Sequence, residues 1–463
     1  MSENLLIEPA YLIAAVLFIL GIRDLSSAET ARRGNLLASI GMFLAIVGTL
    51  LHADIIGYQW IIVGMIIGSI VGAVMAIFMP MTAMPERIAI VNGLGGAASF
   101  LVGISEYYRQ SAEFFLNHQF KMGVVGFEVL LGGLTFTGSM IAFFKLKGLI
   151  SGTPVTYQGQ NAVNIAWLVL MLAIIGYLII VPTTPVLFYV MMVMAVMFGV
   201  MFVLPIGGAD MPVVIAMLNA YSGLAAAATG FVLSNNVLII AGALDGSSGF
   251  FLSILMCRAM NRSIGNVLFG AVGQSVAAPG ISGGGDDGQP QSISVTEAAG
   301  MLLGAQSVII VPGYGMAAAG AHFAVRELAD LLKSRGTSVK YAIHPVAGRM
   351  PGHMNVLLAD ANVPYDELVE MDDVNPEFPE TDVALVMGAN DICNPVARDS
   401  AGTPIDGMPI IDADKAKSVI VIKRSMSPGF AGIPNKLFVA PNTYMLFGDG
   451  KLMAEQLAET LNL

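Results

Sequence analysis

The sequence predicts a polytopic α-helical membrane bundle of nine spans, followed by a doubly wound α/β domain with a parallel sheet. Two observations support this fold class. Apolar residues make up 56% of the 463-residue chain and charged residues only 12%, whereas soluble domains carry about 25% charged residues. Stretches of about 20 apolar residues all precede residue 260, and short strands alternate with helices after residue 290. We therefore expect a membrane domain at 1–260, a glycine-rich linker at 261–290 and a soluble domain at 291–463.

Nine apolar stretches are long enough to cross a membrane. They cover roughly residues 5–22, 34–51, 57–79, 86–107, 122–144, 161–181, 185–205, 211–233 and 236–257. The first is interpreted as a retained span, because Glu3 and Glu8 stand where a signal peptide carries positive charge. An odd number of spans places the two termini on opposite sides of the membrane.

Basic residues in the loops predict the orientation of the spans. One side is flanked by Arg23, Arg32, Arg33, Arg87, Lys145, Lys147, Arg258 and Arg262. The other side is flanked only by Arg109 and Lys121. Because cytoplasmic loops carry the excess of Lys and Arg, we expect the soluble domain in the cytoplasm and the amino terminus outside.

Charge and cysteine content exclude several classes of site. Residues 291–463 carry 12 basic and 20 acidic side chains, a net charge of −8. Binding of nucleic acid requires clustered Lys and Arg, so the acidic soluble domain argues against such a partner. Cys257 and Cys393 are far apart and form no CxxC motif, which argues against a disulfide framework or a cysteine metal site.

Strand and linker signals organise the second part of the chain. Residues 283–290, Gly-Gly-Gly-Asp-Asp-Gly-Gln-Pro, are typical of a flexible linker. Candidate strands are 307–311, 338–343, 383–388, 418–422, 436–439 and 443–447, with helical or loop stretches such as 317–334 and 451–462 between or after them. This alternation is typical of a doubly wound α/β domain.

Three segments match the glycine pattern G-x-G-x-x-[GA], and only one has the context of a dinucleotide-binding turn. Residues 93–98 lie inside a predicted span, where small residues favour helix packing. Residues 283–288 follow no strand and carry two carboxylates where phosphates would lie. Residues 313–318, Gly-Tyr-Gly-Met-Ala-Ala, follow an apolar strand and open a helix, so backbone N–H groups and the helix dipole can hold a pyrophosphate. An ordinary strand-to-helix turn is the alternative.

The ends of two other strands of this Rossmann-like domain favour NADP(H) over NAD(H). An NAD-type site usually places an acid near the end of the second strand, but strand 338–343 is followed by His344 and Pro345. Strand 418–422 is followed by Lys423, Arg424 and Ser425. Two cations and a hydroxyl suit a 2′-phosphate, with a solvated basic loop as the alternative.

Six segments together resemble one known family over essentially the full length of the chain. They are Gly207-Gly-Ala-Asp210-Met-Pro-Val-Val, Gly313-Tyr-Gly-Met-Ala, His344-Pro-Val-Ala-Gly-Arg349-Met-Pro-Gly-His353-Met-Asn-Val-Leu-Leu, Gly388-Ala-Asn-Asp391, Lys423-Arg424-Ser-Met and Phe447-Gly-Asp449. On these segments the chain resembles the β subunits of proton-translocating nicotinamide nucleotide transhydrogenase.

The resemblance implies an enzyme that is active only as a complex. NADP(H) would bind this chain, and an α subunit, as one or two polypeptides, would supply the NAD(H) site and further spans. Hydride would pass directly between the two nicotinamides, so no side chain need act as a nucleophile or metal ligand. The resemblance further implies a dimer of α–β units embedded in lipid in the bacterial cytoplasmic (inner) membrane.

The resemblance also implies which residues bind NADP(H). The pyrophosphate turn would comprise Gly313, Tyr314, Gly315, Met316 and Ala317, and its second wall Val346, Ala347, Gly348, Arg349, Met350 and Pro351. The 2′-phosphate loop would comprise Lys423, Arg424, Ser425 and Met426, and the nicotinamide half Gly388, Ala389, Asn390, Asp391 and Ile392. Gly429, Phe430, Gly448, Asp449 and Gly450 would complete the site. Asp391 is interpreted as a titratable sensor of the cofactor state, with a turn or helix cap as the alternative.

Polar residues inside the spans are the candidates for proton transfer, because they are costly in lipid. The resemblance implies that Asp210, which opens the eighth span, couples the membrane domain to the soluble domain. Helix capping is the alternative role for Asp210. Asn219 lies deeper in the same span. Asn92 occupies the position at which better-known relatives carry the histidine assigned to proton transfer. An amide cannot titrate at biological pH. We therefore hypothesise that His52, Glu128 and Asp245 replace that histidine. The alternatives are an exposed interfacial residue for His52 and a snorkelling or hydrogen-bonded structural acid for Glu128 and Asp245.

Thermodynamic linkage between the soluble domain and the membrane domain would explain how hydride transfer is coupled to proton movement. NADP+ and NADPH are expected to favour different arrangements of the soluble domain, and protonation would bias the same equilibrium. The main competing interpretation is an ion transporter whose soluble domain only senses nucleotide. A membrane-anchored NADPH dehydrogenase would need a second redox group, and no flavin or quinone motif stands out in the sequence.

Overall fold

The computed structural model describes residues 4–27, 30–51, 57–269, 289–399 and 403–462. These residues form two compact units. The first unit comprises Met1–Pro80, Glu86–Ile206 and Val214–Ser253, and the second comprises Met81–Pro85, Gly207–Val213 and Ile254–Leu463. The predicted linker at 261–290 falls largely on residues 270–288, which lie outside the described part of the chain.

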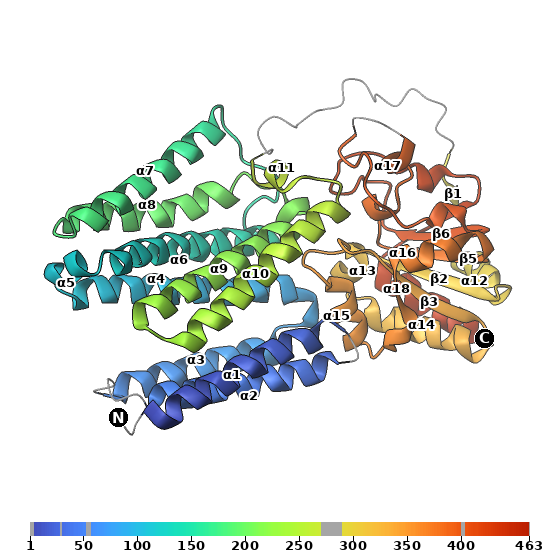
Figure 1. Ribbon diagram of the computed structural model, residues 1–463. Coiled ribbons are helices and arrows are strands. Elements are labelled where there is room, and N and C mark those ends of the chain that lie inside the picture. Colours follow the sequence, from blue (N-terminus) through green and yellow to red (C-terminus); the bar gives the residue numbers. More distant parts are fainter. Residues whose placement is uncertain (1–3, 28–29, 52–56, 270–288, 400–402, 463) are drawn as a thin grey trace. The chain divides into compact units, whose positions relative to one another are not determined.

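The amino-terminal half of the chain is helical (Figure 1). Its helices are α1 (Asn4–Leu25), α2 (Ala31–Leu50), α3 (Gln59–Phe78), α4 (Met84–Arg109), α5 (Ala112–Asn117), α6 (Gln119–Leu146), α7 (Gln160–Ile180), α8 (Pro185–Val203), α9 (Met211–Leu233), α10 (Asn236–Ala259) and α11 (Ile264–Phe269). Two 3-10 turns, η1 (Met81–Ala83) and η2 (Gly208–Asp210), precede α4 and α9.

Eight of the described helical segments are long and apolar enough to cross a membrane, which confirms a membrane protein. They are α2, α3, α4 together with η1, α6, α7, α8, α9 and α10. The remaining predicted span, 5–22, corresponds to α1, a 22-residue helix that is not among these eight. The count of nine spans therefore stays a prediction.

Glycine permits the closest helix contacts in the membrane part. A Cβ on Gly223 of α9 would lie 2.7 Å from Gly246 Cα of α10, and one on Gly132 of α6 would lie 2.7 Å from Phe100 N of α4. Side chains at these positions would separate the helices. Helix α3 differs, because none of its residues is buried, and a Cβ on Gly64, Gly68 or Gly72 would meet no described atom within 4 Å beyond the adjoining residues and backbone of its own helix.

A seven-stranded, wholly parallel sheet forms the core of the second unit, which confirms the predicted α/β domain. Its strands are β1 (Gln291–Ser292), β2 (Ser307–Pro312), β3 (Ser338–Ile343), β4 (Leu368–Glu370), β5 (Val383–Met387), β6 (Ser418–Lys423) and β7 (Thr443–Phe447). The spatial order is β1-β7-β6-β5-β2-β3-β4. The associated helices are α12 (Val295–Leu303), α13 (Tyr314–Ala318), α14 (His322–Ser334), α15 (His353–Asp360), α16 (Met371–Val374), α17 (Val396–Asp399) and α18 (Gly450–Asn462).

Burial explains why the long strands were visible in the sequence. All five residues of β5 are buried, as are four consecutive residues of β6. Strands of a parallel sheet are covered on both faces and therefore read as continuous apolar runs. The two edge strands β1 and β4, of two and three residues, are too short to leave such a signal.

Two predicted elements differ from the structure. The strand predicted at 436–439 is wrong, because Lys436–Val439 forms a 3-10 helix. The side chain of Asn435 accepts a hydrogen bond from Leu437 N at 2.9 Å, and this local cap turns the chain out of an extended conformation. The helix predicted at 317–334 is divided into α13 and α14, with Gly320 between them at a φ of 60°.

Tyr341→Phe tests the packing of this core. Tyr341 is fully buried on β3, and its hydroxyl has no hydrogen-bond partner in the described part of the chain. Removing an unpaired buried hydroxyl should leave the free energy of unfolding unchanged or raise it by about 1 kcal/mol. Leu385→Ala, at a fully buried position of β5, should lower it by about 3 kcal/mol and serves as the control.

Chemical unfolding of the purified full-length protein, followed by a signal from the second unit, measures both changes. If Tyr341→Phe destabilised the protein as much as Leu385→Ala, the buried hydroxyl would have to be paired.

Candidate functional site

The strand order predicts a ligand crevice between β2 and β5. From β2 the chain moves to β3 and β4 on one side, and β5, β6 and β7 lie on the other. In open α/β sheets, ligands bind outside the carboxyl ends of the strands at such a switch point. The turns that follow β2 and β5 begin at Gly313 and Gly388, so two of the predicted segments meet there.

Backbone contacts hold these two turns together. Gly313 N donates to Met387 O at 3.0 Å, and Gly315 N donates to Gly388 O at 2.9 Å. A Cβ on Gly315 would lie 2.7 Å from Gly388 Cα, and Gly388 itself has a φ of 65°. Glycine is therefore required at both positions.

These hydrogen bonds refine the role expected of the glycine turn. The N–H groups of Gly313 and Gly315 bind carbonyls of the β5 segment, and α13 has only five residues. The glycines thus allow two backbones to approach closely, while charge for a bound phosphate has to come mainly from side chains beside the turn.

A cation and two aromatic rings from three segments meet beside this turn. The guanidinium carbon of Arg349 lies 4.2 Å from the centroid of the Tyr314 ring, within the range of a cation–π contact. The centroid of the Phe430 ring lies 6.0 Å from that of Tyr314. The structure therefore brings together the turn after β2, the predicted second wall and the loop after β6.

His353 holds the second wall in place. Its Nδ1 accepts a hydrogen bond from Arg349 N at 3.1 Å. Burial, reinforced by the Arg349 charge, lowers the pKa of His353 to about 4, so the ring is neutral at pH 7 and can accept this bond. Gly348 has a φ of 108°, and a Cβ there would lie 2.5 Å from His353 Nδ1, so the wall requires glycine at this point.

Lys423 braces the loop after β6, whereas the two residues that follow it in the sequence are exposed. The Lys423 ammonium donates to Ser427 O, and its nitrogen lies 4.7 Å from the centroid of the Phe438 ring. Burial lowers the pKa of Lys423, and the charge of Asp391 opposes that change. Arg424 and Ser425 remain exposed at the end of β6, where a ligand can reach them.

Asp391 links the end of β5 to the same loop. Its Oδ2 accepts a hydrogen bond from Ala431 N at 3.0 Å. Burial raises the pKa of Asp391, and the N–H groups of Ala431 and Phe430 and the charge of Lys423 oppose the rise. A Cβ on Gly429 would lie 2.5 Å from Asp391 Oδ1, so the carboxyl group rests directly against the loop backbone.

The amide of Asn390 completes this junction. Oriented with its oxygen toward the loop, it accepts from Lys423 Nζ at 3.0 Å and from Gly429 N at 2.7 Å. The ends of β5 and β6 are thus joined by side-chain bonds to the loop that follows β6.

The other predicted binding residues fall into four groups. Buried side chains that belong to the core, so that only their backbones could face a ligand, are those of Met316, Ala317, Ala347, Met350, Ala389 and Ile392. Exposed apolar side chains near the crevice are those of Met426 and Phe430. Asp449, between Gly448 and Gly450, accepts hydrogen bonds from Lys451 N at 3.1 Å and Leu452 N at 3.4 Å and so caps α18. The side chains of Val346 and Pro351 are half-buried.

In the membrane part, four predicted polar residues form three pairs with polar partners on neighbouring helices. Asn92 Nδ2 donates to Ser139 Oγ at 3.1 Å, linking α4 to α6. Thr229 Oγ1 donates to Glu128 Oε1 at 2.5 Å, linking α9 to α6. Sequence reasoning missed Ser139 and Thr229, although hydroxyl groups inside spans commonly bond across helices.

The third pair differs in its exposure. Asn219 Nδ2 on α9 donates to Asp245 Oδ1 on α10 at 3.1 Å. Glu128 is completely buried, whereas Asp245 lies on the exposed surface of this chain. His52, the remaining candidate, lies outside the described residues.

Asp210 forms an ion pair that the sequence did not reveal. Arg262 Nη1 lies 2.6 Å from Asp210 Oδ1, and both residues belong to the second unit. Burial raises the pKa of the Asp210 carboxyl, and the Arg262 charge opposes that rise. Arg262 was noted only as a loop charge, because a pair 52 residues apart leaves no local pattern.

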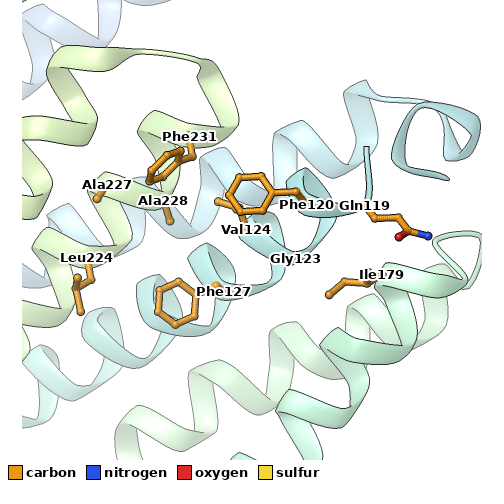
Figure 2. Close-up of a pocket in the computed structure, with 10 residues that line it drawn as sticks. All are labelled: Gln119, Phe120, Gly123, Val124, Phe127, Ile179, Leu224, Ala227, Ala228 and Phe231. Carbon is orange, nitrogen blue, oxygen red and sulfur yellow. The ribbon is translucent and has the colours of Figure 1, made fainter. Parts of the chain in front are cut away.

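The first unit also contains an apolar cavity, and none of the paired polar residues lines it. Its volume is about 490 Å³, and ten residues of α6, α7 and α9 line it (Figure 2). None of these lining residues is titratable, so the cavity offers no proton-transfer group.

Comparison with known proteins agrees with these features. A family model described as "NAD(P) transhydrogenase beta subunit" matches residues 7–460. Two proteins from Rhodospirillum rubrum, each named "NAD(P) transhydrogenase subunit beta", are 47% identical to this chain over 457 residues. The matches cover 98% of this chain and 98% of each relative.

Gly315→Ala tests the close approach of the two turns. The added Cβ would meet backbone atoms of Gly388, so the turns must separate, at an expected overpacking cost of about 1–3 kcal/mol. We expect NADPH binding to weaken by about tenfold or more, as measured by calorimetric titration of the full-length protein.

Gly300→Ala is the matched control, because a Cβ at this position in α12 would meet no described atom within 4 Å beyond the adjoining residues and backbone of its own helix. Equal NADPH affinities for both variants would show that the crevice does not depend on the glycine contact.

Proposed function

Because this chain belongs to the NAD(P) transhydrogenase beta-subunit family, we propose that its switch-point crevice binds NADP(H) within an enzyme that couples hydride transfer to proton movement. The chain is the β component of an oxidoreductase that uses nicotinamide nucleotides and requires an α subunit. The observation that carries the proposal is the convergence of Gly313, Gly388 and the loop after β6 at one edge of the sheet.

The choice of NADP(H) for this chain rests on charge. Arg424 and Ser425 are exposed after β6, two strands away from β2 in the sheet. A guanidinium with a hydroxyl beside it suits the 2′-phosphate that distinguishes NADP(H) from NAD(H). At the end of β3, where an NAD-type site usually places an acid, His344 is buried and its Nε2 lies 2.9 Å from Pro409 O.

The side chains of the crevice would hold and orient the nucleotide. NADP(H) itself supplies the hydride chemistry. Arg349, already placed over Tyr314, would offer positive charge beside the pyrophosphate. Asp391 would respond to the redox state of the nicotinamide, and its hydrogen bond from Ala431 N would transmit the change to the loop.

The NAD(H) half would come from the α subunit. We expect a dimer of α–β units in the bacterial inner membrane, with the soluble domain in the cytoplasm as the loop charges indicate. Two features of the membrane part support helices of a partner beside this chain. Asp245 is exposed although its helix is long enough to cross the membrane, and a carboxylate facing lipid is costly. Helix α3 has no buried residue among those described.

Proton transfer would use the paired polar residues. Asn92 cannot titrate, so the titratable groups of the path are expected to be Asp245, beside Asn219, and Glu128, beside Thr229. The ion pair between Asp210 and Arg262 would serve as the coupling element, because the redox state of NADP(H) and protonation can both bias one such equilibrium.

Arg424→Ala should change nucleotide preference. Losing a charge-assisted contact to the 2′-phosphate is expected to weaken NADPH binding by about 10- to 100-fold, with NADH binding changed by no more than about twofold. Lys451→Ala removes another exposed cation, one that pairs with Glu455 at 3.7 Å, and is the control. Calorimetric titration measures both ligands; equal loss for NADPH and NADH would contradict the assignment.

Asp245→Asn should separate proton movement from hydride transfer. The change keeps the shape of the side chain but removes its titratable group, so proton movement should fall by at least about tenfold. Ser247→Ala, at an exposed position of the same helix where the hydroxyl donates only to Leu244 O within the described chain, is the control.

Vesicles that contain the chain with its α subunit permit both measurements: the internal pH, and reduction of an acetylpyridine analogue of NAD+ by NADPH. Unchanged proton movement in Asp245→Asn would remove Asp245 from the path. Glu128→Gln is tested in the same way.

A further inference from the structure

Lys145 is a buried cation near the end of α6 that the proton path does not use. Its sequence position, close to the end of a span, predicts a loop charge facing water. In the structure the residue is only 5% exposed. Lys147, two residues further along, is exposed and lies 5.6 Å from the centroid of the Phe143 ring, as expected of a surface lysine.

The ammonium of Lys145 is matched to three backbone carbonyls. Its Nζ donates to Leu204 O at 2.5 Å, to Ile206 O at 2.7 Å and to Val203 O at 3.5 Å. A protonated lysine has three N–H donors and no acceptor, so each donor has a partner. A neutral amine, with two donors, could not satisfy this set.

These carbonyls lie where α8 ends. The last carbonyls of a helix have no partner within the helix, and a cation near them is favoured by the helix dipole. Val203 is the last residue of α8, and the chain continues through Leu204 and Ile206. Lys145 therefore fixes both the end of the helix and the residue at which the chain leaves it.

The turn that carries Asp210 begins at the next residue. Ile206 is followed by Gly207 and Gly208, and Asp210 N donates to Gly207 O at 3.1 Å to close the turn. Two consecutive glycines give this stretch little stiffness of its own. Its start is therefore set by the contacts of Ile206, which include the bond from Lys145 beside the hydrogen bond from Ile206 N to Val203 O at 3.1 Å.

We propose that Lys145 is a positioning residue for proton coupling: its ammonium anchors the end of α8 and, through the chain, the start of the turn that carries Asp210. This inference rests on the proposed function, in which Asp210 is the coupling residue. Lys145 acts through the turn and takes no part in hydride transfer. Its loss should affect reactions that need the coupling step more than those that do not.

Two reactions of the complete α–β enzyme in sealed vesicles separate these roles. Net reduction of an NAD+ analogue by NADPH changes the redox state of NADP(H) and needs the coupling step. Exchange of hydride from NADH to the analogue through bound NADP(H) restores NADP(H) in every cycle and has no net coupling step. The ratio of the net rate to the exchange rate is the readout.

In Lys145→Met this ratio should fall by about tenfold or more, because hydrogen bonds to a charged group are lost. In Lys147→Met, the matched control, it should stay at the wild-type value. Lys145→Arg keeps the charge but spreads its donors in a plane, so it should recover the ratio only in part, to about threefold below wild type.

An unchanged ratio in Lys145→Met, or a parallel fall of both rates with no recovery by arginine, would overturn the proposal and leave Lys145 a structural helix cap. If the methionine variant did not accumulate, the arginine variant would decide: a ratio about threefold below that of Lys147→Met is expected, and an equal ratio overturns the inference. If wild type carried out exchange without net proton-linked reduction, the proposed function would itself fail, and this inference with it.

Discussion

The contact between the backbones of Gly315 and Gly388 is the constraint on which the proposed site in the second unit depends. It joins the turns after β2 and β5, the two strands between which the direction of the sheet reverses. Any side chain at either glycine would push these turns apart. Because the turns stay in contact, the loop after β6 can reach the same edge, where Asp391 and Asn390 bind it.

The membrane part follows a related rule, in which close helix contacts place polar side chains in pairs. Gly132 lets α4 approach α6, which carry Asn92 and Ser139. Gly223 lets α9 approach α10, which carry Asn219 and Asp245. Small residues thus allow hydrogen bonds that lipid could not replace.

Features with a local pattern could be predicted from the sequence. The long parallel strands were visible as apolar runs, and the turn at Gly313 was identified by its place between a strand and a helix. The edge strands were missed because they are short, and residues 436–439 were misassigned because the cap formed by Asn435 overrides an apolar run.

Pairings between distant residues could not be predicted. Neither the partners Ser139, Thr229 and Arg262 nor the burial of Lys145 follows from periodicity, because each depends on how two helices or loops meet. The same limit applies to the bond from Lys423, which the sequence grouped with Arg424 as a phosphate ligand, to Ser427 O of its own loop. Residue type identified the candidate sites, and three-dimensional contacts divided their roles.

The central claim is that hydride transfer between a nucleotide bound to this chain and a nucleotide bound to the α subunit moves protons across the membrane. The most direct measurement is the internal pH of sealed vesicles that contain both subunits, recorded while NADPH reduces an NAD+ analogue. The account predicts a pH change that tracks hydride transfer and stops when either nucleotide is omitted. Sustained hydride transfer in sealed vesicles without any pH change would contradict it.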